Sequence, residues 1–171
     1  MTAEEYLALL KERLAGNFDV EAARPLAGAV YPLYARSRVV AGRYFLHRSI
    51  TYERIEINEH VLCRVLPGPA TMDQVCSFVD ELKGLPGRLV RPTYEHMSSA
   101  ITGVLISESG FEPPAVGKLT RSGFTKHFWL GLRGWCFLRL LGVDLATGQI
   151  WANRRGKEVI NGYVPGQGPR Q

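Results

Sequence analysis

The chain has 171 residues, 46% of them hydrophobic and 22% charged, which fits one folded domain and excludes a disordered or disulfide-rich protein. Cys63, Cys76 and Cys136 are far apart and form no CxxC pair, which disfavours a structural zinc site and fits reduced, buried thiols in a cytoplasmic protein. Residues 1–85 carry 10 basic and 11 acidic side chains, whereas residues 86–171 carry 11 and 5, so the net charge of +5 comes from the second half. A basic half can attract an anionic partner, although a solvated basic face is the simpler reading.

The first third of the chain predicts one helix followed by strands. Ala3 to Ala15 has apolar residues at helical spacing, and Thr2 is a suitable N-cap. Residues 18–28 read as irregular, because Pro25 would break a helix. Further on, β-branched and aromatic side chains predict strands over residues 33–41, 43–50, 52–57 and 60–66, with turns at Gly42 and at Asn58-Glu59.

The rest of the chain mixes helices and strands. Thr71 caps a predicted helix from Met72 to Lys83, and a loop follows over residues 84–92. Residues 98–107 form an apolar strand without alternation, so we expect both of its faces to be covered. The remaining predicted elements are a helix over 113–121, a hairpin of strands 124–132 and 135–144, and a short strand over 149–153.

This order predicts an α+β fold: a largely antiparallel mixed sheet of about six to eight strands, with three helices packed mainly on one face. We expect residues 1–161 to form a single domain and residues 162–171, rich in Gly and Pro, to form a flexible tail. The N-terminus lacks the positive start of a secretory signal. The most apolar stretch, residues 127–145, contains Arg133, Arg139 and Asp144, which disfavours a membrane partner.

Motifs for phosphate loops and metals are weak. Neither GxxxxGK[ST] nor GxGxxG occurs after a predicted strand. Glu53 and Glu56 could hold a metal with His47 or His60, but their odd separation places them on opposite faces of a strand. We therefore predict no metal site and no cofactor.

The order of a helix, three strands and a helix resembles restriction-endonuclease-like folds. Those enzymes hold magnesium with an Asp followed by a Glu-x-Lys on adjacent strands. Here Glu56 is followed by Ile57 and Asn58, and no predicted strand contains Glu-x-Lys. The nuclease interpretation therefore lacks its decisive residues, and we treat the order as common to small α+β domains.

Glu95 and His96 precede the apolar strand and are weak candidates for acid–base catalysis. A carboxylate and an imidazole at the mouth of a strand would suit a small hydrolase-like enzyme. No GxSxG elbow surrounds Ser98 and Ser99, and a local hydrogen-bonded turn explains the pair as well.

Arg139 is the most informative residue, because it lies within the apolar segment CFLRLLGV. Alternation places it on the same face as Phe137, Leu141 and Val143. A guanidinium among apolar neighbours needs a negative partner, either a carboxylate of the protein or an anionic ligand.

Other basic residues near Arg139 suggest the same chemistry. His127 and Arg133 alternate with tryptophans, a pattern found on single-strand nucleic-acid surfaces, although a packed tryptophan-rich hairpin would look alike. Arg154, Arg155 and Lys157 surround a glycine turn and could bind a phosphate, or simply cover a loop.

Three hypotheses remain open from the sequence. The first is a binding module for an anionic ligand or nucleic acid, through Arg139, Arg133, His127, Arg154, Arg155 and Lys157. The second is a small hydrolase-like enzyme that uses Glu95 and His96. The third is a structural or oligomer-forming protein, with a homodimer as one form.

Overall fold

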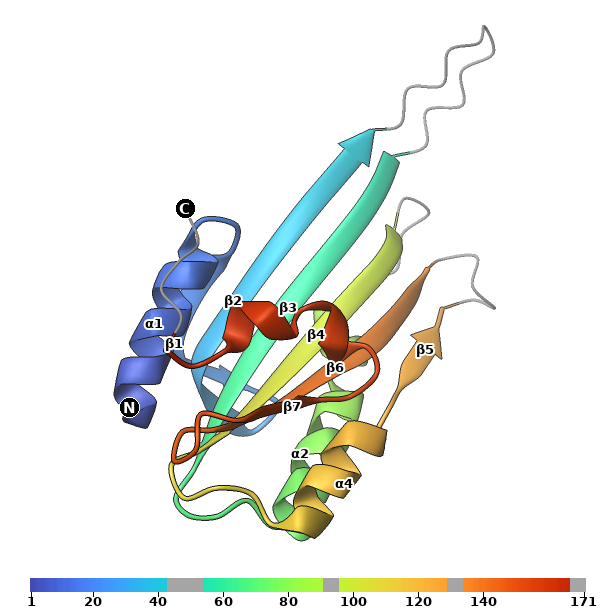
Figure 1. The fold of residues 1–171 in the computed structure, drawn as a ribbon. Coiled ribbons are helices and arrows are strands. Elements are labelled where there is room, and N and C mark those ends of the chain that lie inside the picture. The colour runs from blue at the N-terminus through green and yellow to red at the C-terminus, as the bar shows by residue number, and fades with distance from the viewer. Residues whose placement is uncertain (43–53, 91–95, 129–133, 167–171) are drawn as a thin grey trace, which may run out of the picture.

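The computed structural model describes residues 1–42, 54–90, 96–128 and 134–166, and its centre is a mixed sheet of seven strands (Figure 1). The strands are β1 (Asp19–Leu26), β2 (Ala29–Gly42), β3 (Arg54–Leu66), β4 (His96–Ser107), β5 (Thr125–His127), β6 (Trp135–Asp144) and β7 (Ile150–Ala152). Their order is β1-β2-β3-β4-β6-β5, and β7 also pairs with β6. The α+β class and the mixed sheet of six to eight strands are confirmed.

The centre of the sheet is parallel and its borders are antiparallel. Strand β4 runs parallel to both β3 and β6, whereas the β1–β2, β2–β3, β5–β6 and β6–β7 pairs are antiparallel. The two parallel pairs need crossover connections. Helix α2 (Met72–Gly84) lies between β3 and β4 in the chain, and α4 (Pro113–Arg121) lies between β4 and β6.

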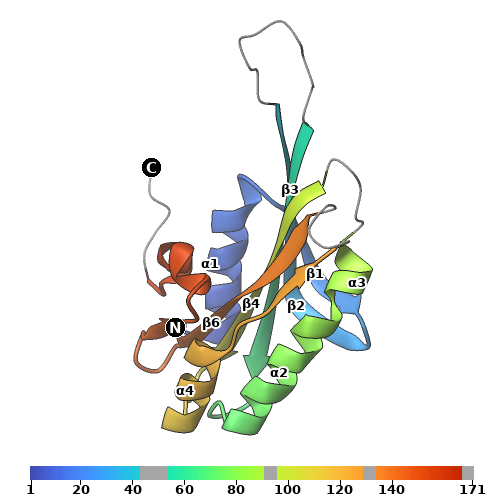
Figure 2. The same cartoon turned by 90° about the vertical axis from the view of Figure 1, so that its right-hand side faces the viewer.

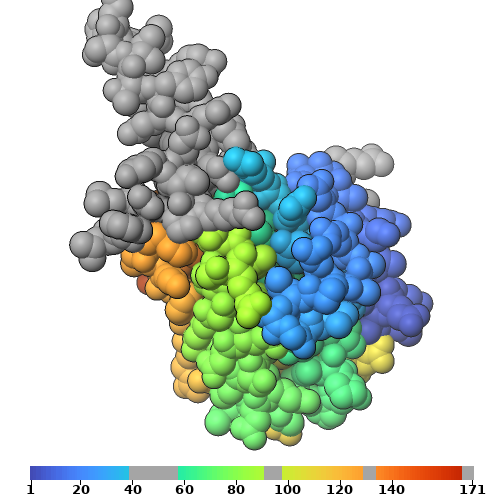
Figure 3. Space-filling view, turned by 180° about the vertical axis from the view of Figure 1, so that it is seen from behind, coloured from blue at the N-terminus to red at the C-terminus, as the bar shows by residue number. Residues whose placement is uncertain are grey.

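Helices cover both faces of the sheet (Figures 1 and 2). Helix α1 (Ala3–Ala15) packs on one face, on a core that includes Leu33, Val104 and Leu141. Helices α2 and α4 and the single turn α3 (Pro86–Leu89) lie on the other face, over a second core. Figure 3 views that second face, with α2 and α3 beside the hairpin of β1 and β2. Among the described residues, α2, α3 and α4 thus share one face of the sheet, while α1 lies on the other.

Two glycines of the central strands let the crossover helices approach closely. A Cβ atom added at Gly103 in β4 would overlap the side chain of Leu82 in α2, and one at Gly142 in β6 would lie 3.0 Å from Leu119 in α4. Larger residues at these positions would push each helix away from the sheet. The glycines therefore set the position of α2 and α4, which form part of the candidate site.

Capping residues and prolines in the sequence correctly predicted where three of the helices begin. Thr2 and Thr71 each cap a helix, and Glu5 and Gln74 complete the two capping boxes. The predicted helix over 113–121 is α4, with two prolines in its first turn. The apolar strand predicted over residues 98–107 is also confirmed, since residues 99–107 are all buried.

Several predictions on the strands were wrong. Residues 18–28 are not irregular but contain β1, which tolerates Pro25 because an edge strand needs no bond from every backbone N–H. Asn58-Glu59 is not a turn, because β3 continues through it and pairs with strands on both sides. The predicted loop over 84–92 contains the short helix α3. The predicted strand over 43–50 lies outside the described residues.

The end of the described chain packs on α1. After β7, the 3-10 turns η2 (Gly156–Glu158) and η3 (Ile160–Tyr163) return to this helix. The hydroxyl of Tyr6 donates a hydrogen bond of 2.5 Å to the carbonyl of Tyr163, and Arg13 donates one of 2.9 Å to the carbonyl of Val164. The packed part of the chain therefore reaches at least Val164, within the segment that we expected to begin the tail.

Two cysteines are buried, as expected for structural thiols. Burial raises the pKa of the Cys63 thiol, and it raises that of Cys136 to about 12. Neither is a thiolate at neutral pH. Cys76 is partly exposed, and all three thiols are free.

Candidate functional site

The site lies at the edge of β6 where β5 ends and β7 begins. Strand β5 pairs with residues 135–137 of β6, and β7 pairs with residues 141–143. The short stretch of β6 between them, from Leu138 to Leu140, has no strand partner on this side. Side chains and loop backbone complete the edge here.

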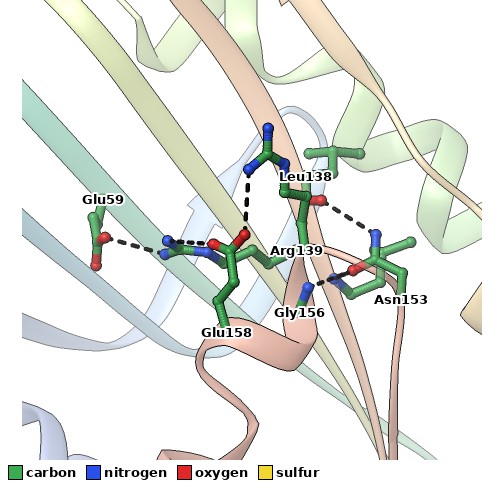
Figure 4. A network of polar contacts seen from close by, with 8 residues as sticks. Glu59, Leu138, Arg139, Asn153, Gly156 and Glu158 are labelled. Atoms are coloured by element: carbon green, nitrogen blue, oxygen red, sulfur yellow. Dashed lines mark hydrogen bonds and ion pairs between the residues drawn. The ribbon is translucent and has the colours of Figure 1, made fainter.

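Asn153 fills this gap with its side-chain amide (Figure 4). Its Oδ1 atom accepts hydrogen bonds from the backbone N–H groups of Leu140 (3.0 Å) and Gly156 (2.7 Å). Its Nδ2 atom donates to the carbonyl oxygens of Ser122 (2.9 Å) and Leu138 (3.2 Å). The buried amide thus replaces a peptide group of the missing strand and joins β6 to the segment after α4 and to η2.

Gly156 lets η2 come close to β6. A Cβ atom at this position would lie 2.6 Å from the carbonyl oxygen of Leu140 and 3.0 Å from Oδ1 of Asn153. Since one of these atoms belongs to the backbone, no side-chain movement could make room. Gly156 therefore fixes the turn that carries Arg154, Arg155 and Glu158.

A cavity of about 530 Å³ opens over this junction, and we call it the arginine cavity. Its cations are Arg121 at the end of α4 and Arg154 and Arg155 after β7. The remaining residues of the lining are Thr120, Ser122, Gly123, Phe124, Thr125, Leu138, Asn153 and Glu158. Three arginines from two distant segments therefore line one recess, and Glu158 is the acidic residue among the described residues of the lining.

The three arginines differ in their partners. Arg155 is 3.2 Å from Oε1 of Glu158, and its guanidinium carbon lies 5.0 Å from the centre of the Phe137 ring. Arg121 folds back on its own helix and donates a hydrogen bond of 2.9 Å from Nε to the carbonyl of Gly117. Arg154 is exposed. A ligand could therefore reach Arg154 directly and would compete with Glu158 for Arg155.

A second recess adjoins the arginine cavity, and we call it the helix groove. It has a volume of about 430 Å³ and shares Arg121, Ser122 and Gly123 with the arginine cavity. The rest of its lining comes from α2 and α4: Met72, Lys83, Pro114 and Lys118. The two recesses thus lie side by side with three residues in common, and the groove adds two lysines.

Arg139 forms ion pairs with carboxylates of the protein itself, which changes the anion-binding role that we expected for it. Its side chain is 11% exposed, and its guanidinium is 3.1 Å from Glu59 and 3.5 Å from Glu158 (Figure 4). It also lies 5.3 Å from the centre of the Phe137 ring. The predicted face is correct, since Leu141 and Val143 belong to the core under α1. Because two internal carboxylates neutralise Arg139, this residue gives no reason to expect an external anion.

The other predicted residues are scattered. His127 is exposed in β5, and Lys157 is exposed in η2, outside the lining of the arginine cavity. Arg133 and Glu95 lie outside the described residues. His96 begins β4, but its side chain also lies outside the description.

The sequence prediction missed Arg121, Lys83 and Lys118. All three occupy last turns of helices, where basic side chains commonly stabilise the helix dipole. That ordinary role hid them, because only the packing of α2 against α4 brings them to one groove. The available signal in the sequence was that the last turns of two predicted helices both carry basic side chains.

A separate recess of about 370 Å³ surrounds His60, and Asp19, Arg36, Ser37, Arg38, Asn58 and Leu89 complete its lining. Nδ1 of His60 is 2.8 Å from the hydroxyl of Tyr34. Burial, aided by the charge of Arg36, lowers the pKa of His60 to about 4. His60 is thus a neutral, hydrogen-bonded residue at neutral pH, and the side chains of its predicted metal-binding partners Glu53 and Glu56 lie outside the described residues.

The described residues contain no group of three or more His, Cys, Asp or Glu side chains that could hold a metal ion. None of the helices in the described part of the chain has the length and apolar character needed to span a membrane.

Comparison with known proteins identifies the family but no activity. Neither the curated proteins nor the solved structures include a match to this chain. Residues 2–165 match the model of a family described as a domain of unknown function (DUF8052). Since that match covers nearly the whole chain, including α1, the sheet and the arginine cavity, the protein belongs to the DUF8052 family.

Proposed function

We propose that this protein is a binding module for phosphate-bearing anions and that the arginine cavity is its binding site. The observation that carries the proposal is the convergence of Arg121, Arg154 and Arg155 on one recess. Guanidinium groups bind phosphate oxygens through paired N–H donors, and they keep their charge at every physiological pH.

The charge balance of the cavity supports an external anion. Glu158 offsets part of the charge of Arg155, but it also lies 3.5 Å from Arg139, so one carboxylate is shared between two arginines. Arg121 and Arg154 have no carboxylate among the ion pairs of the described residues. A phosphate would add the negative charge that this lining lacks.

The two other hypotheses gain less from the structure. The hydrolase-like alternative depends on Glu95 and on the side chain of His96, and both lie outside the described residues. The exposed large hydrophobic residues among those described are Met1, Val30 and Met72. They lie on three separate segments, so they do not form one exposed apolar strand through which a homodimer could pair.

Calorimetric titration with pyrophosphate at low salt tests the proposal. Replacing Arg154 and Arg155 by Gln should weaken pyrophosphate binding by about a hundredfold, because each of the two lost charged hydrogen bonds contributes about 1.5 kcal/mol. A double variant with Lys11→Gln and Arg88→Gln, two exposed cations away from the cavity, is the matched control and should bind as the wild type does. Equal losses in both double variants, or no binding by the wild type, would refute the proposal.

A further inference from the structure

We propose that the arginine cavity and the helix groove together form one track that binds single-stranded nucleic acid. The inference rests on the proposed function, because the arginine cavity supplies half of the track. Its basis is the shared wall: Arg121, Ser122 and Gly123 line both recesses. A ligand that fills the arginine cavity therefore contacts residues that also line the groove, and a longer chain of phosphates could cross this shared wall.

The groove follows the length of two helices. Met72 and Pro114 line it near the beginnings of α2 and α4, and Lys83 and Arg121 line it near their ends. From Met72 to Lys83 the helix rises about 16 Å at 1.5 Å per residue. Phosphates of one strand follow each other about every 3.4 Å along the axis of a duplex and are farther apart in an unstacked strand, so this length accommodates fewer than about five nucleotides. The groove alone is thus long enough for several phosphates.

Five cations are distributed along the track and are not gathered at one point. Lys83 and Lys118 belong to the groove, Arg121 to both recesses, and Arg154 and Arg155 to the cavity. The lining acid is Glu158, and Asp80 lies 3.1 Å from Lys83. A compact anion could contact only one end of this series. A chain of phosphates could contact all of it.

The lining suits a nucleic acid better than a lipid surface. Phe124 is partly buried in the wall of the arginine cavity, where its ring can stack on a base. Insertion into a membrane needs an apolar face beside the cations. Met72 is the exposed large hydrophobic residue of this lining, so the track offers no such face.

The small size of the two recesses favours a single strand over a duplex. The two recesses have volumes of about 430 and 530 Å³, which is the size of small-molecule sites. A flexible strand can lower its phosphates and an unstacked base into such recesses. A duplex keeps its bases stacked inside and could touch only the rim.

A length series of oligothymidylates, followed by fluorescence anisotropy at low salt, tests the track. Affinity should rise from the mononucleotide to the hexanucleotide and level off before the dodecanucleotide. Replacing Lys83 and Lys118 by Gln should weaken hexanucleotide binding by about tenfold and leave mononucleotide and pyrophosphate binding nearly unchanged. The slope of log affinity against log salt should fall by about 1.4, since each phosphate contact contributes about 0.7 for a single strand.

Two controls exclude trivial causes. Both lysines can stabilise helix ends through the dipole, so the melting temperature of the lysine variant must match that of the wild type. The Lys11→Gln, Arg88→Gln protein should bind the hexanucleotide as the wild type does. Phe124→Leu keeps an apolar side chain against the core and should lower hexanucleotide affinity by about fivefold, with no effect on pyrophosphate.

The outcomes separate this inference from the proposed function. The track is refuted if the hexanucleotide binds no better than the mononucleotide, or if the lysine substitutions do not change its affinity. In that case, pyrophosphate binding that depends on Arg154 and Arg155 would still support the arginine cavity as an anion site. If pyrophosphate and oligonucleotides both fail to bind, both proposals fall. Equal affinity for a duplex, or tighter binding to vesicles of acidic phospholipid, would also overturn the assignment to a single strand.

Discussion

Arg139 and the arginine cavity lie on neighbouring segments, but they differ in how far carboxylates of the protein neutralise their positive charge. Arg139 is nearly buried and is held by Glu59 and Glu158, whereas Arg154 is exposed and the cavity around it has one shared acid. An arginine without solvent must have an internal partner, because an unpaired buried charge is very costly. An arginine in water needs no such partner and stays available to a ligand.

The comparison shows that an arginine within an apolar segment of the sequence is not thereby the residue that binds an external anion. Arg139 stood out in the sequence, yet its place in the core is the reason why the protein supplies its carboxylates. If this distinction is correct, substitutions in the two regions should separate stability from binding.

The largest effect is expected from Asn153, which joins the two regions. Asn153→Ala should lower the free energy of unfolding by about 4 kcal/mol, because four hydrogen bonds of about 1 kcal/mol each are lost inside the protein. Chemical denaturation measures the change, and Asn161→Ala, at an exposed position of η3, is the control. A loss below about 1 kcal/mol would mean that the amide is not what holds η2 against β6.

Replacing Arg139 tests the buried side of the comparison directly. Arg139→Met should reduce the free energy of unfolding by about 3 kcal/mol, since it leaves Glu59 and Glu158 without their shared cation. Arg154→Met should change it by less than about 0.5 kcal/mol, as is usual for an exposed side chain. Pyrophosphate affinity should show the reverse order. Equal stability losses would show that burial does not distinguish the two arginines.

The sequence revealed what short-range signals encode. Thr2 and Thr71 begin helices through hydrogen bonds to residues three positions away, so their effect is visible in a local pattern. Asn58 and Glu59 look like a turn for the same reason. They lie instead in a long strand, and Glu59 bonds to Arg139, 80 residues further along the chain.

The site was harder to predict than the helices, because its residues meet only through tertiary packing. Arg154 and Arg155 could be selected as a basic turn, but nothing near them in the sequence points to Arg121. They share a cavity because α4 crosses from β4 to β6 and Asn153 ties the following segment to β6. The parallel pairing of β3, β4 and β6 was missed for the same reason, since register between distant strands is not a local property.

Acid offers a second way to separate stability from ligand binding. The usual pKa of histidine, 6.5, falls to about 4 for His60 in the folded protein. As the pH falls, His60 is therefore protonated in the unfolded chain before it is protonated in the folded protein. Its contribution to the free energy of unfolding is fully present above about pH 6.5 and is lost as the pH falls towards 4. Between about pH 7 and about pH 5 the contribution of His60 should decrease by about 2 kcal/mol.

The variant His60→Gln isolates this effect from the titration of carboxylates. Its free energy of unfolding should fall by about 2 kcal/mol less than that of the wild type over the same interval. The His60 recess shares no residue with the arginine cavity, so pyrophosphate affinity of the folded protein should have the same pH dependence in both proteins. Identical stability profiles would mean that His60 takes up its proton in the folded state as easily as in the unfolded chain.

The smallest effect is expected from Glu158, the residue that both regions share. Glu158→Gln removes a carboxylate that is half exposed, so stability should change by less than about 1 kcal/mol. Pyrophosphate should bind about fivefold more tightly, because a neighbouring negative charge worth about 1 kcal/mol in water no longer opposes it. Calorimetric titration measures this gain, and Glu12→Gln, on the exposed side of α1, should leave the affinity unchanged. Weaker binding in Glu158→Gln would give the carboxylate a different role: it would hold Arg155 in place for the ligand, and the order imposed by that ion pair would outweigh its repulsion of the phosphate.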